Sequence, residues 1–416
     1  MNLPFNKISV IGLGYIGLPT AATLASRGVE VIGVDVSPRA VESISRGEIH
    51  IVEPDLDAVV RQVVEKGKLK AVSEPQPAEV FILAVPTPFH GQHKPDLSYI
   101  KAAAKSIAPV LKKGNLVILE STSPVGTTEK LSQWLAESRK DLTFPHLKGE
   151  KADIQLAYCP ERVLPGKVLQ ELVQNDRIIG GLTQKATRMA KAVYQIFVTG
   201  QCLESDARTA EMAKLTENSF RDVNIAFANE LSLICEKLHI NVWELIELAN
   251  HHPRVKILQP GPGVGGHCIA VDPWFIVDSA PKESRMIRTA REVNDGKPHH
   301  VVSMVRAAAK KSKKPVVACL GLAFKADIDD LRESPAVEIV RELAKDKKIK
   351  ILAVEPHVQE LPRELAGIKN IELCDTEEAL RRSSVAVLLV NHRVFLNLNQ
   401  KLLKGKTIID TRGGWR

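Results

Sequence analysis

The stretch KISVIGLGYIG, residues 7–17, decides how the N-terminal part of this chain folds. Its β-branched run (7–11) ends at Gly12, and a helical segment, LPTAATLASR, follows the turn until Gly28 stops it. A second apolar run, VEVIGV (29–34), ends at Asp35. Residues 7–35 therefore predict a strand, a glycine-rich turn, a helix and a second strand. Ser37 and Pro38 then predict the N-cap and first turn of another helix.

The glycines of this turn have the spacing of a dinucleotide-binding fingerprint. Gly12, Gly14 and Gly17 follow a strand and open a helix, and Asp35 closes the next strand 18 residues after Gly17. Glycines at these positions let the backbone approach a pyrophosphate, and the carboxylate binds the adenosine ribose. A carboxylate there repels a 2′-phosphate, which favours NAD over NADP, although Arg39 nearby keeps NADP open. The alternative is a strand–helix turn that binds nothing.

Apolar runs alternate with helical segments along most of the chain, which predicts an α/β fold with mostly parallel sheets. A long segment without proline or glycine interrupts this pattern and predicts one continuous helix, residues 206–237. We therefore expect two Rossmann-like, doubly wound domains joined by a long central helix. The expected domains are residues 1–205, 206–310 and 311–416. The remaining expected strands are 80–85, 116–120, 154–158, 177–181, 316–324, 349–356, 385–390 and 407–410.

The bulk composition is that of an ordinary globular protein, with 416 residues, 44% hydrophobic and 25% charged. The net charge of +8 suggests an anionic partner, but the 4% aromatic content argues against nucleic acid. Six scattered cysteines without close pairs fit a reducing compartment, so we expect a cytoplasmic protein. The chain has no apolar run long enough for a membrane span.

A second glycine-rich stretch, GPGVGGHCIAVDPWF (261–275), raises three possibilities for Cys268: a metal ligand, a packed thiol or a reactive thiol beside a ligand. His251, His252 and His267 could suggest zinc, but their spacing with Cys268 is not that of a metal site, and we expect none. The loop is too rich in glycine for a core element. A nucleotide site together with an exposed cysteine favours oxidation through a covalent thiohemiacetal and thioester.

Polar residues gather on one face of the long helix. Lys214, Asn218 and Arg221 are four and seven residues apart, so they fall within about 60° of one another around the helix axis. A solvated face explains this pattern as well as an active site does.

These motifs together resemble the UDP-glucose/GDP-mannose dehydrogenase family along nearly the whole chain. The matching pieces are VIGLGYIGLP, AVPTP, ESTSPVGT, AYCPERVLPG, AEMAKLTENSFRDVNIAFANEL, GPGVGGHCIAVDPWF and GLAFKADIDDLRESPA. The resemblance implies an N-terminal NAD domain, a central helix used for homodimerisation and a C-terminal UDP-binding domain. It also implies oxidation of a sugar C6 alcohol to a carboxylate with two NAD⁺, for polysaccharide biosynthesis.

The resemblance also assigns site residues. Cys268 matches the nucleophile, Lys214 the oxyanion-stabilising lysine, Asn218 its hydrogen-bonding neighbour and Asp272 a carboxylate that activates the water or the alcohol. Thr122 and Glu161 match groups around the nicotinamide and the catalytic water. Predicted cofactor residues are Gly12, Gly14, Tyr15, Ile16, Gly17, Asp35, Arg39, Thr87, Thr122 and Arg332. Predicted substrate residues are Arg162, Val163, Lys214, Asn218, Arg221, His252, Arg254, Gly265, Phe324 and Lys325.

One departure bears on the sugar. UDP-glucose dehydrogenases often carry a second glutamate four residues after Glu161, where this chain has Pro165. With FRDVN and HHPRV, this resembles the family branch that oxidises UDP-N-acetyl-D-mannosamine. UDP-glucose and UDP-N-acetylglucosamine stay open as substrates. Two rivals lack any need for Cys268: a non-catalytic NAD or nucleotide sensor, and a two-electron dehydrogenase of the 3-hydroxyacid or 6-phosphogluconate type.

Overall fold

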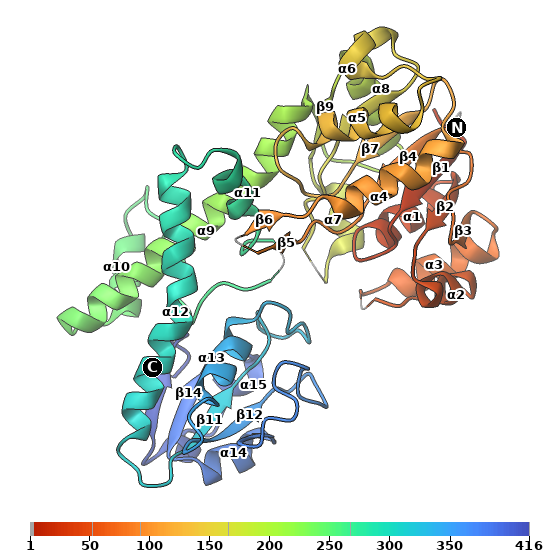
Figure 1. Ribbon diagram of the computed structural model, residues 1–416. Coiled ribbons are helices and arrows are strands. Elements are labelled where there is room, and N and C mark those ends of the chain that lie inside the picture. The colour runs from red at the N-terminus through yellow and green to blue at the C-terminus, as the bar shows by residue number, and fades with distance from the viewer. Residues whose placement is uncertain (1–3, 52, 92, 165, 267, 416) are drawn as a thin grey trace. The chain divides into compact units, whose positions relative to one another are not determined.

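The computed structural model describes residues 4–51, 53–91, 93–164, 166–266 and 268–415. The chain divides into a first unit, residues 1–217, and a second unit, residues 218–416. Each is built around a sheet that is largely parallel (Figure 1). The predicted α/β fold class is therefore confirmed.

The first unit contains an eight-stranded sheet in the order β10-β9-β8-β7-β4-β1-β2-β3, in which only β8 and β9 pair antiparallel. The glycine-rich turn lies between the central strand β1 and helix α1. Sheet strands are β1 (Lys7–Ile11), β2 (Glu30–Val34), β3 (Leu69–Val72), β4 (Val80–Leu83), β7 (Leu116–Leu119), β8 (Gln155–Tyr158), β9 (Arg177–Gly181) and β10 (Cys202–Asp206).

Helices cover both faces of this sheet because successive strand residues point to opposite faces. Val80 and Ile82 of β4 pack into one apolar cluster with α1, α3 and α8, whereas Phe81 and Leu83 pack into another with α4 and α5. The helices are α1 (Gly17–Ser26), α2 (Pro38–Ser45), α3 (Leu56–Glu65), α4 (Ser98–Ile107), α5 (Thr127–Ser138), α6 (Pro145–Lys148), α7 (Val168–Gln174) and α8 (Gln184–Tyr194). A short hairpin pairs β5 (Phe89–His90) with β6 (Lys94–Pro95).

The local signals at the start of the chain are confirmed. Gly28 has φ +97° directly after α1, and the Ser37 hydroxyl accepts a hydrogen bond from the Ala40 N–H at 3.4 Å, with Pro38 in the first turn of α2. The predicted long helix is α9 (Ala207–Leu238), one continuous helix in Figure 1.

The second unit holds a five-stranded parallel sheet in the order β13-β12-β11-β14-β15. Its faces are covered by α12 and α13 on one side and by α14 and α15 on the other. The strands are β11 (Val316–Leu320), β12 (Lys350–Val354), β13 (Ile371–Leu373), β14 (Val385–Leu388) and β15 (Thr407–Asp410). The helices are α10 (Val242–Asn250), α11 (Asp272–Ser279), α12 (Arg285–Ala309), α13 (Pro335–Leu343), α14 (Thr376–Arg382) and α15 (Arg393–Leu396).

Candidate active site

The glycine-rich turn after β1 needs each of its glycines for a different reason. Gly12 has φ +90°, and a Cβ on it would lie 2.6 Å from the Ala84 carbonyl oxygen. A Cβ on Gly17 would lie 1.8 Å from the Gly12 carbonyl oxygen. A Cβ on Gly14 would meet no atom within 4 Å, so this part of the turn faces open space. The turn is thus tight on its protein side and open on the side where a pyrophosphate binds.

Asp35 closes this turn from the end of β2. One carboxylate oxygen accepts the Leu13 N–H at 2.8 Å and the other accepts the Ser37 N–H at 2.8 Å. The side chain is only partly buried, and each oxygen keeps a lone pair for a ribose hydroxyl. Gly14 and Asp35 therefore fit a dinucleotide. Tyr15 and Arg39 are exposed beside them.

The structure brings together the two threonine loops that follow β4 and β7. The Thr87 hydroxyl donates to the Thr122 carbonyl oxygen at 2.5 Å, and the Ser121 hydroxyl donates to the Val85 carbonyl oxygen at 2.6 Å. Both loops follow the carboxyl ends of parallel strands, where α/β sheets bind ligands.

Glu211 on α9 was not predicted, yet it anchors one of these loops. Its buried carboxylate accepts the Gly126 N–H at 2.6 Å, the Thr128 N–H at 2.8 Å and the Thr128 hydroxyl at 2.7 Å. These hydrogen bonds tie the start of α5 to the helix that carries Lys214. Nothing in the sequence distinguishes Glu211 from the other acids of this helix; its burial shows that it is an anchor.

Glu161 lies just beyond β8 and is buried, with 7% of the residue exposed. Its Oε2 accepts the Val163 N–H at 2.6 Å, while Oε1 has no hydrogen-bond partner among the residues that the structure describes. Burial raises the pKa of Glu161, and the charges of Arg177 and Lys214 partly oppose this rise. Glu161 and Lys214, both predicted site residues, are thus electrostatically coupled.

Arg162, predicted to contact substrate, has another partner here. Its Nη2 lies 2.8 Å from Glu217 Oε1 and its Nε 3.2 Å from Glu217 Oε2, which ties it to α9. Its Nη1 donates to the Asp176 carbonyl oxygen at 3.0 Å. A substrate would have to compete with Glu217 for this guanidinium.

In the second unit, three of the predicted catalytic residues are connected. The Asn218 amide donates to Asp272 Oδ2 at 2.5 Å, and the Asp272 N–H donates to the Cys268 carbonyl oxygen at 2.9 Å. Asn218 and Asp272 are buried, whereas Cys268 is the exposed one among the six cysteines. A packed core thiol at Cys268 is therefore excluded. A tight turn, in which the N–H groups of Val271 and Asp272 both donate to the Cys268 carbonyl oxygen, leads directly into α11.

The glycines before Cys268 pack against protein. A Cβ on Gly265 would lie 2.4 Å from the Glu333 carbonyl oxygen and 3.0 Å from the Phe324 Cβ. A Cβ on Gly261 would lie 2.7 Å from the Arg412 guanidinium. The immediate neighbours of these two glycines are therefore the loop after β11 and the end of the chain. Gly265 and Phe324, both predicted substrate residues, therefore lie side by side. Arg412, which was not predicted, lies against the same glycine-rich stretch.

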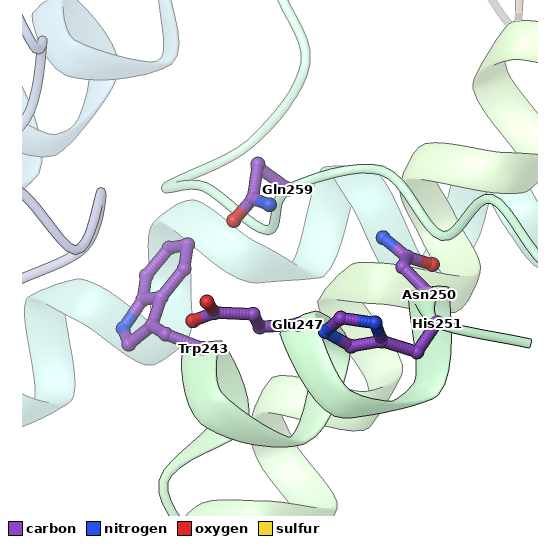
Figure 2. Close-up of a pocket in the computed structure, with 5 residues that line it drawn as sticks. All are labelled: Trp243, Glu247, Asn250, His251 and Gln259. Carbon is purple, nitrogen blue, oxygen red and sulfur yellow. The ribbon is translucent and has the colours of Figure 1, made fainter.

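Five further predicted residues are exposed: Arg221, His252, Arg254, Lys325 and Arg332. Arg332 forms an ion pair with Asp330 at 2.6 Å, and His252 Nδ1 accepts the Arg254 N–H at 3.3 Å. A pocket of about 370 Å³ adjoins His252 but uses other side chains, namely Trp243, Glu247, Asn250, His251 and Gln259 (Figure 2). Pro165 and His267 lie outside the described residues.

Among the described side chains, Asp327, His357 and His392 have ligand atoms within 4.8 Å of one another, as a metal site requires. His392, however, uses both ring nitrogens: Nδ1 accepts the Asp327 N–H at 2.9 Å and Nε2 lies 3.1 Å from Glu355 Oε2. A metal would have to displace one of these bonds. The absence of a metal stays a prediction.

In the part of the chain that the structure covers, no helix is long and apolar enough to cross a bilayer.

Comparison with known proteins identifies three consecutive segments. Residues 6–198 match the NAD binding domain of the UDP-glucose/GDP-mannose dehydrogenase family, residues 208–296 its central domain and residues 318–416 its UDP binding domain. The predicted family, the enzyme class and NAD as the cofactor are thereby confirmed.

Individual relatives agree with this family assignment. An NDP-N-acetyl-D-galactosaminuronic acid dehydrogenase of Ralstonia nicotianae is 62% identical, over 100% of this chain and 97% of the relative. A UDP-N-acetyl-D-mannosamine dehydrogenase of Yersinia pestis is 61% identical over 100% of both chains. The solved structure of a UDP-D-ManNAc dehydrogenase from Pyrococcus horikoshii superposes with a TM-score of 0.89 at 38% identity, over 99% of this chain and 96% of that one.

Proposed function

Because the chain belongs to the UDP-glucose/GDP-mannose dehydrogenase family, we propose that it oxidises the C6 alcohol of UDP-N-acetyl-D-mannosamine to the carboxylate, with two NAD⁺. The sugar is supported by relatives of that name at about three-fifths identity over the full chain. Residues 1–205 would hold NAD, 206–310 most of the catalytic side chains and 311–416 the UDP moiety. The reaction would take place in the cytoplasm, where NAD is available and scattered cysteines stay reduced.

The connected set Asn218, Asp272 and Cys268 is the observation that carries this proposal. NAD⁺ would accept a hydride from the sugar C6 in each of two oxidations. After the first, the Cys268 sulfur bonds to the aldehyde carbon and the carbonyl oxygen takes a proton, which gives a thiohemiacetal. The second oxidation removes the hydride and the hydroxyl proton and leaves a thioester. Water then adds to the thioester carbon, the C–S bond breaks, and carboxylate and thiol are released.

The other predicted residues would stabilise charge, transfer protons or orient water in these steps. Lys214, one helical turn before Asn218 on α9, would stabilise the oxygen that becomes negative in each oxidation. Asn218 would hold Asp272 in place, and Asp272 would accept a proton from the alcohol or from water. Glu161 would orient the hydrolytic water with the oxygen that lacks a partner within the described chain.

The direct test is NADH production with UDP-sugars and mass analysis of the products. Two NADH per sugar and a uronate product support the proposal. One NADH with an aldehyde or ketone product contradicts it and favours a two-electron dehydrogenase, and no turnover with any sugar favours a sensor.

Cys268→Ser should reduce kcat by about a thousandfold or more, because a hydroxyl is a weaker nucleophile and leaving group than a thiolate. The partly buried Cys202→Ser is the matched control and should keep kcat. Wild-type kcat in Cys268→Ser would rule out the covalent route.

A second candidate substrate is the corresponding N-acetyl-D-galactosamine nucleotide, because relatives named NDP-N-acetyl-D-galactosaminuronic acid dehydrogenase are equally similar. UDP-N-acetylmannosamine, UDP-N-acetylgalactosamine, UDP-N-acetylglucosamine and UDP-glucose should therefore be compared by kcat/KM. The highest value identifies the substrate, and a preference for UDP-glucose would contradict both candidates.

We also propose that the enzyme is a homodimer through α9. Phe220, Phe227 and Ile234 recur every seven residues along one side of this helix, with 68%, 53% and 45% of each residue exposed. A regular apolar stripe on a long helix is the usual surface for a second helix. Phe227→Glu should shift the mass in solution from dimer to monomer by light scattering, whereas Glu230→Gln, on the same exposed helix, should not. A wild-type monomer contradicts the proposal.

A further inference from the structure

A fully buried ion pair lies behind Glu161 in the first unit. Arg177 at the start of β9 and Glu120 after β7 are each 1% exposed, and Arg177 Nη1 lies 3.7 Å from Glu120 Oε1. Hydroxyl groups complete the surroundings of Glu120: Tyr194 donates to Oε1 at 3.3 Å and Thr20 to Oε2 at 3.4 Å. No predicted role uses this pair, although buried charges of this kind are costly to maintain.

Arg177 connects Glu120 to the loop that carries Glu161. Its Nη1 also donates to the carbonyl oxygen of Pro160, the residue before Glu161, at 3.4 Å. Its guanidinium lies 5.2 Å from the centre of the Tyr194 ring, and Nη2 has no hydrogen-bond partner among the described residues. Arg177 therefore holds the Glu161 loop and still has donor capacity.

Two buried carboxyls thus depend on one guanidinium. Burial raises the pKa of Glu120, the positive charge of Arg177 opposes this rise and the negative charge of Glu161 adds to it, which together bring the pKa to about 7. Burial also raises the pKa of Glu161, again against the charge of Arg177. Each carboxyl therefore makes ionisation of the other harder, and their titrations are coupled.

The remaining titratable groups around the pair stay in one protonation state near neutral pH. Burial raises the pKa of the Cys159 thiol to about 12 and that of the Tyr194 phenol well above its usual value. Lys214 adds a positive charge on the Glu161 side. Glu120 is therefore the group of this set that titrates near neutral pH, and the charge of Glu161 opposes its ionisation.

We propose that Glu120 and Glu161 share the positive charge of Arg177, so that Arg177 is a positioning residue for Glu161 and Glu120 sets the pH at which Glu161 ionises. This inference rests on the proposed role of Glu161 in thioester hydrolysis. A carboxylate must be ionised to orient and deprotonate water, so Glu120 would tune the acid side of the activity profile without touching substrate.

The test is the isosteric variant Glu120→Gln, with exposed Glu137→Gln as the matched control. In the wild type the acid limb of kcat against pH should be broad, because two coupled carboxyls lose their protons in succession. In Glu120→Gln it should contract to one step and shift to lower pH by roughly half a unit or more, because Arg177 then serves Glu161 alone. The KM for the sugar should not change. An acid limb that superimposes on the wild type overturns the inference.

An infrared titration keeps this test independent of turnover. Between about pH 6 and pH 8 the wild type and Glu137→Gln should lose the C=O band of a protonated carboxyl, and Glu120→Gln should lack that change. A protonated-carboxyl band that still disappears between about pH 6 and pH 8 in Glu120→Gln overturns the inference, even if no UDP-sugar is turned over and the proposed function fails. If Glu120→Gln does not fold, Tyr194→Phe removes one donor to Glu120, so the same band should titrate at higher pH; an unshifted titration contradicts the inference.

Discussion

An acid follows the second strand of each of the two large sheets, but the two acids have different surroundings. Asp35, after β2, accepts two backbone N–H groups and remains partly exposed. Glu355, after β12, is 4% exposed and accepts the N–H groups of Leu322 and Ala323 at 2.7 and 2.9 Å, while His392 lies 3.1 Å from the same oxygen. A ribose can reach the first carboxylate, whereas the chain's own histidine occupies the second.

The turns opposite these acids differ in the same way. In the first unit, Gly14 faces open space. In the second unit the turn keeps one glycine, Gly321, which corresponds to Gly12: both have a positive φ, and their N–H groups donate to the Val354 and Val34 carbonyl oxygens at 2.8 Å. The place of Gly14 is taken by Ala323, which is 1% exposed. The same strand–turn–helix element thus forms a dinucleotide site only where neighbouring side chains leave it open. This agrees with a UDP-binding rather than a second NAD-binding domain at the C-terminus.

The largest effect is expected where the turn is tightest. Gly17→Ala forces a Cβ to within 1.8 Å of a backbone oxygen that cannot move away, so it should lower the free energy of unfolding by about 3 kcal/mol or more. Gly14→Ala, in the same turn, should change the stability by less than about 1 kcal/mol but raise the KM for NAD. Urea unfolding measures the first effect and kinetics the second. Equal stability of the two variants would contradict the distinction.

The next effect separates the two acids. Asp35→Ala should raise the KM for NAD by roughly ten- to a hundredfold, because charge-assisted hydrogen bonds to the ribose are lost. Glu355→Gln should leave that KM unchanged and instead lower the free energy of unfolding by about 1–2 kcal/mol, since it disturbs buried bonds to backbone N–H groups. Affinity for the UDP-sugar is the control for Asp35→Ala: if it falls as much as that for NAD, the variant is misfolded or the site is misplaced.

The smallest expected effect is the dependence of stability on pH that Glu355 causes. Burial raises the pKa of Glu355, but the hydrogen bond from His392 and those from the backbone outweigh this and lower it below the ordinary 4.5. Because the folded-state pKa is depressed, the carboxylate stabilises the fold above about pH 4.5, and this stabilisation is lost as the pH falls through the folded-state pKa. The hydrogen-exchange protection factors of residues 350–390, which are corrected for the intrinsic effect of pH, should therefore fall with acid more in the wild type than in Glu355→Gln. Parallel responses would show that Glu355 does not titrate there.

Much of the fold could be predicted because its signals are local. The β1–α1–β2 unit, α9 and most strands carry glycine positions or apolar periodicity that short segments reveal. The strands β3, β5, β6, β10 and β13 were missed. β5, β6 and β13 have only two or three residues, whereas β3 and β10 lie at the two edges of the eight-stranded sheet. β10, with the sequence CLESD, is largely polar, so its pairing with β9 rather than its composition makes it a strand.

The candidate site also has features that the local sequence predicts and features that depend on tertiary contacts. The sequence by itself determined the glycine turn, Asp35, Cys268 and the spacing of Lys214 and Asn218, because each depends on residue type and near neighbours. Only the tertiary structure decided that Asn218 binds Asp272, 54 residues away, and that Glu120 and Arg177 share a buried site behind Glu161. It also decided that His392 contacts the Glu355 carboxylate. Contacts between distant segments depend on how strands and helices pack, and packing leaves no mark in the local sequence pattern.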